Sequence, residues 1–286
     1  MTTRQWKAAR RSLAWGERTL VMGILNVTPD SFSDGGEFSS LDRAVAHAEQ
    51  MIEAGADLID IGGESTRPGS QFVSEQQEMD RVIPVIERLS SNASIPISID
   101  TTKSSVARAA LAAGAEIVND ISGLRFDVAI ADEVARTGAG LVLMHSRGTP
   151  KDMQQLPPVA DIMSEVVNGL RESIRVANQH GVANIAIDPG IGFGKTVEQN
   201  LELIAKLDQL AREFAALPIV IGPSRKSFLG KLLDGALADQ RLHGTIASIT
   251  ASVLNGAHIV RVHDVKAAVE AVRVADAIRK GRAYAS

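Results

Sequence analysis

The 286-residue chain contains no cysteine, and aromatic residues make up only 3% of its positions. Without cysteine the protein has no disulfides, thiolate metal sites or cysteine nucleophile, and a reducing compartment is favoured. With so few aromatic residues, the core must be built mainly from Ala, Val, Ile and Leu.

The sequence also lacks a long apolar run and a strong net charge. No stretch reaches the roughly 18 apolar residues that a membrane span requires. The basic N-terminus, from Arg4 to Arg11, is not followed by the apolar stretch of a secretory signal. The formal charge of −4 is too small, and of the wrong sign, for a general nucleic-acid binder. We therefore expect a cytoplasmic protein without membrane or nucleic-acid partners.

Short apolar runs recur along the chain, with starts about 34 residues apart, which is the size of one βαβ unit. Being short, continuous and rich in β-branched residues, they indicate strands that are buried on both faces. The eight runs are Leu20–Leu25, Leu58–Ile61, Ile95–Ile99, Ile117–Val118, Leu141–Met144, Ile185–Ile187, Ile219–Ile221 and Ile259–Val262.

Between the runs lie amphipathic helical stretches such as Leu41–Ala54, where Leu41, Val45, Ala48 and Ile52 share one face. Four of these stretches end at a glycine shortly before the next run, and glycine readily takes the left-handed conformation that closes a helix. These glycines are Gly55, Gly114, Gly181 and Gly256. The pattern predicts a single α/β domain over 1–286, a (β/α)8 TIM barrel with its core at about 18–280 and a short extension at 1–17. A doubly wound open sheet is the alternative.

Every predicted strand delivers a polar or ionisable group at its carboxyl end, where such barrels place their active sites. These groups are Asn26, Asp60, Asp100, Asn119, His145, Asp188, the run Ser224-Arg225-Lys226, and Arg261 with His263. A single Asp after a strand is usually a cap or turn residue, but eight polar ends on one rim predict a site.

The basic groups of this rim suggest an anion. Arg261 and His263 project from the same face of the last strand, and an inward-facing Arg is costly unless it meets a negative charge. Arg67 and Lys226 could add further cationic donors. In the alternative interpretation, Arg261 pairs with an internal carboxylate such as Asp60.

The acids suggest a second, different end of the same ligand. Asp100, Asn119 and Asp188 supply two carboxylates and an amide, which suit a flat heterocycle with several N–H donors. The rim therefore predicts a ligand with a donor-rich heterocycle at one end and an anion at the other.

Two motifs point elsewhere and are set aside. The segment GIGFGKT (Gly190–Thr196) resembles a phosphate-binding P-loop, but Pro189 stands where that motif needs its first glycine. Its glycines are better explained as allowing the backbone to approach a ligand closely, or as allowing the loop to flex. Asp100 and Asp188 could form a glycosidase pair, yet the rim has few aromatic residues and several basic ones.

Seven segments together resemble the dihydropteroate synthase family, the folate-pathway enzymes that sulfonamides inhibit. They fall at the predicted strand ends, in the family's order, over about residues 20–265. They are MGILNVTPDSFSDGG (Met22–Gly36), DIGGESTRPGS (Asp60–Ser70), SIDTTK (Ser98–Lys103), IVNDISG (Ile117–Gly123), DPGIGFGKT (Asp188–Thr196), GPSRKSFLG (Gly222–Gly230) and IVRVHDV (Ile259–Val265).

The resemblance implies a transferase that condenses 6-hydroxymethyl-7,8-dihydropterin diphosphate with 4-aminobenzoate, giving 7,8-dihydropteroate and diphosphate. It implies Mg2+ as the cofactor, with Asn26 as its ligand, and a homodimer. The Ala-rich helix Thr245–Leu254, composed mostly of small residues, could contact a neighbour, although core packing would explain its composition equally well. Five residues are implied in catalysis: Asp100, Asp188, Lys226, Arg261 and His263.

Each substrate group has its own implied set of residues. The pterin set is Asp100, Asn119, Asp188 and Lys226, with Met144 over one pterin face. The diphosphate set is Arg67, Arg261 and His263. The aminobenzoate set is Thr66, Phe193, Lys226 and Ser227, and Gly222 and Ser224 are further substrate contacts.

Some residues of the rim have other expected roles. The segments Thr28–Ser39 and Gly62–Ser74 are expected lids that exclude water. His145 has no implied role and is expected to be a hydrogen-bonded rim residue.

Two other functions remain open at this point. A methyltetrahydrofolate methyltransferase barrel would share the acidic pterin-binding residues but would have no use for the diphosphate cluster. A non-catalytic relative would bind pterin or a partner without turnover.

Overall fold

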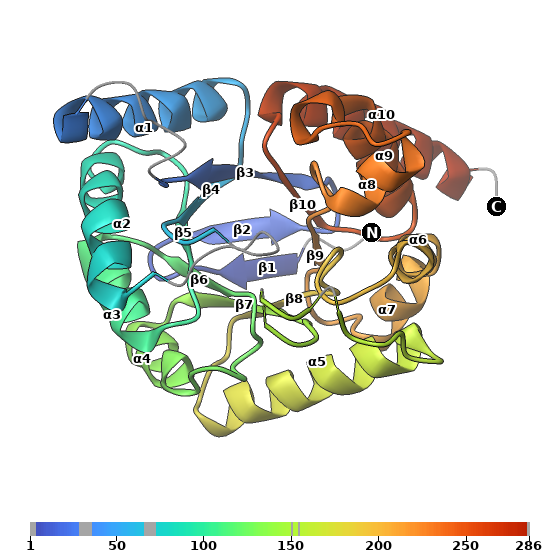
Figure 1. Cartoon of the computed structure of the whole chain (residues 1–286), viewed down its shortest axis with the longest axis horizontal. Helices are drawn as coiled ribbons and strands as arrows, with labels where there is room; N and C mark the ends of the chain where they lie inside the picture. The colour runs from blue at the N-terminus through green and yellow to red at the C-terminus, as the bar shows by residue number, and fades with distance from the viewer. Residues whose placement is uncertain (1–3, 29–35, 66–72, 150, 154, 285–286) are drawn as a thin grey trace.

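The computed structural model describes residues 4–28, 36–65, 73–149, 151–153 and 155–284. Eight parallel strands form a ring that helices surround on the outside (Figure 1). The strands are β3 (Leu20–Asn26), β4 (Leu58–Gly62), β5 (Ile97–Asp100), β6 (Ile117–Asp120), β7 (Gly140–Met144), β8 (Ile185–Asp188), β9 (Val220–Ile221) and β10 (Ile259–Val262). All eight predicted strands are confirmed.

The ring follows the order of the chain and closes between its first and last strands. β10 pairs with β3, and each following strand pairs with the next as far as β8. A parallel bridge from Ile187 to Ile219 and a hydrogen bond from Ile187 N to Pro218 O (3.0 Å) join β8 to the β9 region. The sheet is therefore the predicted (β/α)8 barrel and not an open doubly wound sheet.

Helices follow the strands and cover the outside of the barrel. They are α1 (Gly36–Glu53), α2 (Glu75–Ser90), α3 (Ser104–Ala113), α4 (Ala129–Thr137), α5 (Ile162–Gln179), α6 (Val197–Ala205), α7 (Leu207–Glu213), α8 (Ser227–Leu232), α9 (Leu242–Leu254) and α10 (Val265–Tyr284). The predicted helix Leu41–Ala54 lies within α1 apart from its last residue, and it buries Val45 and Ala48 as expected. The four glycines predicted to end helices all have left-handed φ values, between +82° and +116°.

Sequence reasoning missed a β-hairpin in the N-terminal extension, formed by β1 (Arg4–Lys7) and β2 (Ser12–Trp15). Trp6 and Trp15 are buried against residues from the starts of the barrel strands, such as Leu20 and Leu58. The Trp6 indole N–H also donates to Asn184 O at 3.2 Å. The hairpin thus covers the amino ends of the strands and lies across the ring in Figure 1.

Side-chain alternation along the strands explains where polar residues can lie. Ile59 and Ile61 of β4 pack outward against the helices, so Asp60 between them projects into the barrel. Val260 and Val262 of β10 place Arg261 inside in the same way. The inward-facing residues are therefore apolar near the hairpin and polar at the carboxyl ends of the strands. The site lies at the carboxyl end of the barrel.

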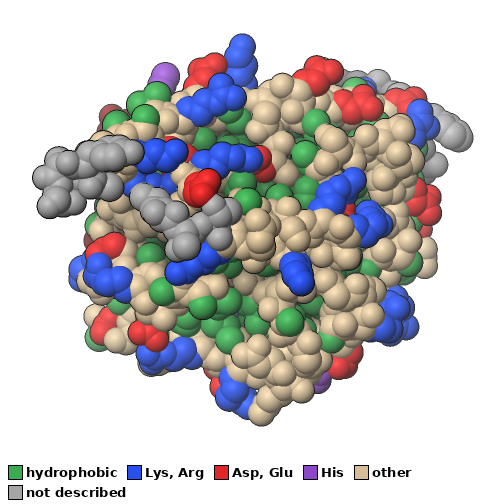
Figure 2. Space-filling view, turned by 180° about the vertical axis from the view of Figure 1, so that it is seen from behind, with side chains coloured by type: hydrophobic (Ala, Val, Ile, Leu, Met, Phe, Trp, Pro, Cys, Tyr) green, Lys and Arg blue, Asp and Glu red, His purple; other side chains and the backbone are tan. Residues whose placement is uncertain are grey.

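The opposite view shows one face of the outer surface (Figure 2), where basic and acidic side chains are interspersed. Within the described part of the chain, no helix combines the length and apolar character needed to cross a membrane.

Candidate active site

A cavity of about 450 Å3 opens at the carboxyl ends of the strands. Most of the predicted site residues line it, although they come from five different strands or the loops after them. These are Asn26, Asp100, Phe193, Gly222, Ser224, Lys226, Ser227, Arg261 and His263. The structure therefore brings the predicted acidic and basic groups to one mouth of the barrel.

The floor of this region is a buried polar network. Asp100 is paired in register with Asn119 on the neighbouring strand. The Asn119 amide donates to Asp60 Oδ2 at 2.9 Å, and Asp60 has no exposed surface. Within the described residues, Asp60 Oδ1 is buried without a hydrogen-bond partner. A buried acceptor of this kind is costly unless a ligand or water satisfies it.

Arg261 lies between two of these carboxylates. Its Nε donates to Asp60 Oδ2 at 2.6 Å, and its Nη2 donates to Asp100 Oδ2 at 2.7 Å. The alternative interpretation, an internal ion pair with Asp60, is therefore the one the structure shows. Barrel curvature directs the inward side chains of β4, β5 and β10 to one point, and the binding of a further anion by Arg261 stays a prediction.

The segment after β9 is held in a strained shape that presents its polar groups. Arg225 has a positive φ of 58° and makes two hydrogen bonds to the Asp264 carboxylate, at 2.6 and 3.0 Å. Ser224 Oγ lies 3.0 Å from His263 Nδ1, so the hydroxyl orients the imidazole. Lys226 Nζ lies 4.0 Å from the centroid of the Phe193 ring, a cation–π contact on the cavity wall.

Asp188 lies two residues before the GIGFGKT segment, and its Oδ1 accepts the N–H of Gly190 at 2.7 Å. Gly190, Gly192 and Gly194 all have positive φ values. A side chain at Gly190 would overlap the carbonyl oxygen of His145, and one at Gly194 would crowd Arg147. These two glycines thus allow the backbone of this loop to pack closely on the chain after β7.

Burial shifts the pKa values of the ionisable groups at the cavity. It raises the pKa of Asp100, although the Arg261 guanidinium opposes the shift. It raises the pKa of Asp188 to about 6, against the stabilising N–H of Gly190. It lowers the pKa of Lys226 to about 8, and nearby Arg261 adds to that effect. Strongly perturbed groups that converge in one cavity are typical of functional sites.

Known proteins resemble this chain in sequence and in fold. The profile described as "Pterin binding enzyme" matches residues 22–263. A dihydropteroate synthase from Synechocystis sp. is 50% identical over 266 residues, covering 92% of this chain and 91% of the relative. The chain belongs to the dihydropteroate synthase family. Family membership makes it an enzyme of folate synthesis.

Two solved structures of dihydropteroate synthase from Xanthomonas albilineans have the same fold. One, with 4-aminobenzoic acid, has a TM-score of 0.89 and 43% identity, and covers 97% of this chain and 99% of that chain. The other, in complex with 7,8-dihydropteroate, has a TM-score of 0.86 and 41% identity, and covers 96% of this chain and 99% of that chain.

Some predicted residues of this dihydropteroate synthase family member lie away from the cavity lining or outside the described residues. Asn119 and Asp188 are not part of the cavity lining and are buried, at 4% and 5% exposure. Met144 packs in a small cluster with Ile121, Met153 and Phe193. Thr66 and Arg67, and most of the two expected lids, lie outside the described residues.

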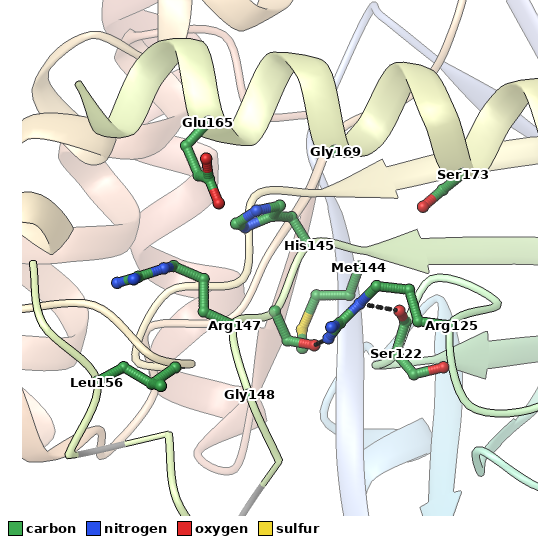
Figure 3. Close-up of a pocket in the computed structure, with 11 residues that line it drawn as sticks. Ser122, Arg125, Met144, His145, Arg147, Gly148, Leu156, Glu165, Gly169 and Ser173 are labelled. Atoms are coloured by element: carbon green, nitrogen blue, oxygen red, sulfur yellow. Dashed lines mark hydrogen bonds between the residues drawn. The ribbon is translucent and has the colours of Figure 1, made fainter. Parts of the chain in front are cut away.

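His145 does not occupy the rim as expected. It is buried beneath α5, where its ring contacts Gly169, in a separate cavity of about 320 Å3 that Arg125, Arg147 and Glu165 also line (Figure 3). Among the described residues, its Nδ1 has no hydrogen-bond partner. Burial and nearby cations lower the pKa of His145 to about 2, so the ring is neutral. Successive side chains of a strand project to opposite faces, so Met144 packs with Phe193 while His145 projects toward α5.

Sequence reasoning gave some residues of the site no specific role. Asp60 was predicted at the rim and as a possible partner of Arg261, but not among the substrate-binding residues. Thr28, Ser65 and Arg225, which belong to the expected lids or to the predicted run Ser224-Arg225-Lys226, also line the cavity, and so does Arg241, which was missed. No local pattern marks Arg241, which reaches the site by donating to Arg225 O at 2.9 Å.

Arg261→Met should lower the free energy of unfolding by about 3 kcal/mol, because it leaves the buried carboxylates of Asp60 and Asp100 without their cation. Urea unfolding at neutral pH measures the loss. Arg225→Met is the matched control, since the Arg225–Asp264 pair is more exposed and should contribute about 1 kcal/mol. Equal losses in the two variants would contradict the importance assigned to the buried network.

Proposed function

We propose that the protein condenses 6-hydroxymethyl-7,8-dihydropterin diphosphate with 4-aminobenzoate to give 7,8-dihydropteroate and diphosphate. This is a transfer of an alkyl group other than methyl. The observation that carries the proposal is one cavity whose lining places the carboxylate of Asp100 and the amide of Asn26 beside the basic groups of Lys226, Arg261 and His263. The solved relatives with 4-aminobenzoic acid and with 7,8-dihydropteroate support the same assignment.

The buried acids suit the pterin end of the substrate. A carboxylate accepts paired hydrogen bonds from adjacent ring N–H and amino groups, and an amide can donate and accept beside it. Asp100 and Asn119 lie at the ends of the neighbouring strands β5 and β6, and Asp188 lies at the end of β8, two strands further around the ring. Met144 and its neighbour Phe193 supply apolar surface next to these polar groups.

The basic groups suit the diphosphate. A guanidinium has five N–H donors, and the two carboxylates account for two of those of Arg261, so the same side chain can also donate to a phosphate oxygen. Lys226 and the imidazole of His263 line the same cavity. Arg67 would complete this set from the segment after β4.

The residues also fit a bound Mg2+ ion. Mg2+ prefers oxygen ligands, retains several waters and commonly binds through one or two protein oxygens plus substrate phosphates. Asn26 offers an amide oxygen on the cavity wall, and the described residues contain no cluster of three His, Asp or Glu side chains that would hold the ion alone. When bound, the ion would neutralise negative charge on the diphosphate.

The reaction follows from these charges. The bond from the pterin methylene carbon to the diphosphate oxygen breaks, and both electrons leave with the diphosphate. The neutral amino group of 4-aminobenzoate forms the new C–N bond and then loses one proton. Asp100 and Asp188 stabilise the positive charge that develops on the pterin, while Lys226, Arg261 and His263 stabilise the leaving group. The amine is nucleophilic when neutral, so no dedicated general base is required.

We also propose that the protein forms a homodimer through the side of the barrel that carries α8, α9 and α10. Five of the eight large hydrophobic residues exposed in the described part of the chain lie there: Leu232, Leu233, Leu237, Val274 and Ile278. Exposed apolar residues gathered on one side of a protein favour an interface there. The segment Thr245–Leu254, expected to contact a neighbour, falls within α9, which packs against α10.

Purified protein with Mg2+ should form 7,8-dihydropteroate from the two substrates, as measured by chromatography of the product. Chelation with EDTA should reduce the rate to background, and excess Mg2+ should restore it. Absence of product above an enzyme-free control at saturating substrate would refute the proposed reaction. A rate that EDTA leaves unchanged would refute only the metal requirement.

Pterin binding should weaken as the pH falls through about 6, because the pKa of Asp188 is raised to about 6 and only its ionised form accepts two hydrogen bonds. Calorimetric titration with 6-hydroxymethylpterin should show the dissociation constant rising toward tenfold per pH unit below that value. Asp188→Asn should bind about 10-fold more weakly at neutral pH and show a flatter pH dependence. Asp208→Asn, on exposed α7, is the control. A variant as pH-dependent as the wild type would remove Asp188 from the binding site.

The wild-type protein should sediment as a dimer at micromolar concentration. The double variant Val274→Lys/Ile278→Lys should sediment as a monomer, because two charges would be buried in the interface. Phe126→Lys alters an exposed apolar residue outside the α8–α10 side and should leave the dimer intact. A monomeric wild type, or a dimer that survives the double substitution, would refute this interface.

A further inference from the structure

Lys195 is a buried cation that the proposed chemistry does not use. Its side chain belongs to the GIGFGKT segment, and the residue is only 7% exposed. Its Nζ donates to three backbone carbonyl oxygens: Gly190 at 2.8 Å, Phe193 at 3.0 Å and His145 at 3.2 Å. An ammonium group has three N–H donors, so these three carbonyls match its full hydrogen-bonding capacity.

The three carbonyls belong to two different parts of the chain. His145 follows β7, whereas Gly190 and Phe193 lie in the loop after β8. Lys195 therefore ties this loop to itself and to the neighbouring strand end. The contact of Gly190 with the His145 carbonyl, and a hydrogen bond from Arg147 Nη1 to Gly194 O at 3.0 Å, join the same two segments.

Two groups of the proposed site depend on the backbone that Lys195 holds. The carbonyl of Phe193 is one of its acceptors, and the Phe193 ring forms the cavity wall beneath Lys226. The carbonyl of Gly190 is another, and the N–H of the same residue supports the Asp188 carboxylate at 2.7 Å. A shift of this loop would therefore move a wall and a floor of the cavity together.

We propose that Lys195 is a positioning residue for the condensation, which holds the loop after β8 in the shape that presents Phe193 to the aminobenzoate and supports Asp188. This inference rests on the proposed function. The ammonium is needed because an uncharged amine offers two N–H donors for three carbonyls. Burial lowers the pKa of Lys195 to about 7, with the Asp188 carboxylate opposing and Arg147, Lys226 and Arg125 adding to the shift.

Lys195→Met tests the proposal, since methionine has a similar length but no donors. We expect the KM for 4-aminobenzoate to rise about tenfold or more, with a smaller change in kcat, because the binding wall is displaced while the reacting groups remain. Lys195→Arg, which keeps the charge and the donors, should recover most of the loss. Lys206→Met is the control, because Lys206 is exposed and its ammonium pairs with Glu202, one turn earlier, at 2.7 Å.

Hydrogen exchange of the Gly190–Phe193 amides separates positioning from a general effect on stability. Loss of protection in this loop together with a raised KM, and recovery of both in Lys195→Arg, is the expected result. A folded Lys195→Met protein with wild-type KM would overturn the inference, as would a raised KM with unchanged loop protection.

If Lys195→Met does not fold, Lys195→Arg carries the test. Loop protection and KM must then change together or both remain at the wild-type level, and a change in one alone contradicts the proposal. The activity of the wild-type protein is measured before any variant is compared. A wild-type protein without activity would refute the proposed function and not the role of Lys195.

Discussion

The contacts of Arg261 with Asp60 and Asp100 connect β10 with β4 and β5 at the carboxyl end of the barrel, and the site depends on them. Three charged side chains from strands far apart in sequence meet at 2.6 and 2.7 Å in a region almost closed to water. Breaking such a network by removing one member leaves buried charge without compensation, which is strongly destabilising. The carboxylates also keep the guanidinium in place, so the same contacts that limit its movement make it a fixed donor for an arriving anion.

Around this network the acids and bases are interleaved. Arg261 touches Asp100 directly, and Lys226 lies within electrostatic reach of both Asp100 and Asp188. The expectation from sequence was a negative end and a positive end of one ligand. In the structure the two kinds of charge share one cavity and partly neutralise each other before any ligand binds. Such a site is electrostatically prepared for a substrate that separates into a cation and an anion.

Sequence reasoning predicted the barrel well because its signals are local and repeated. Short apolar runs, the spacing between them and the glycines at helix ends each reflect one βα unit, and all eight strands lie where these patterns placed them. It also placed most of the polar rim, because strand ends in a closed parallel sheet must meet. It could not show that Arg261 satisfies two carboxylates at once, since that depends on how three strands curve toward each other.

Other features were missed for equally physical reasons. The hairpin at Arg4–Trp15 has short, mostly exposed strands, which give only a weak sequence signal. Its two tryptophans are buried only because they pack against the amino end of the barrel, which the local sequence does not show. His145 was misplaced because one residue of register decides whether a side chain faces the barrel or a helix. Arg241 acts through a carbonyl of a loop distant in sequence, which no short motif encodes.

The covered amino end has a consequence for the order of events. Because Trp6 and Trp15 pack under the barrel, the cavity opens to solvent at the carboxyl end of the strands. Molecules therefore enter and leave through the same opening. Both substrates of the proposed reaction would have to enter through this opening, and both products would have to leave through it. Because the reaction joins the two substrates, the buried acids would become free for the next cycle only when the joined product leaves.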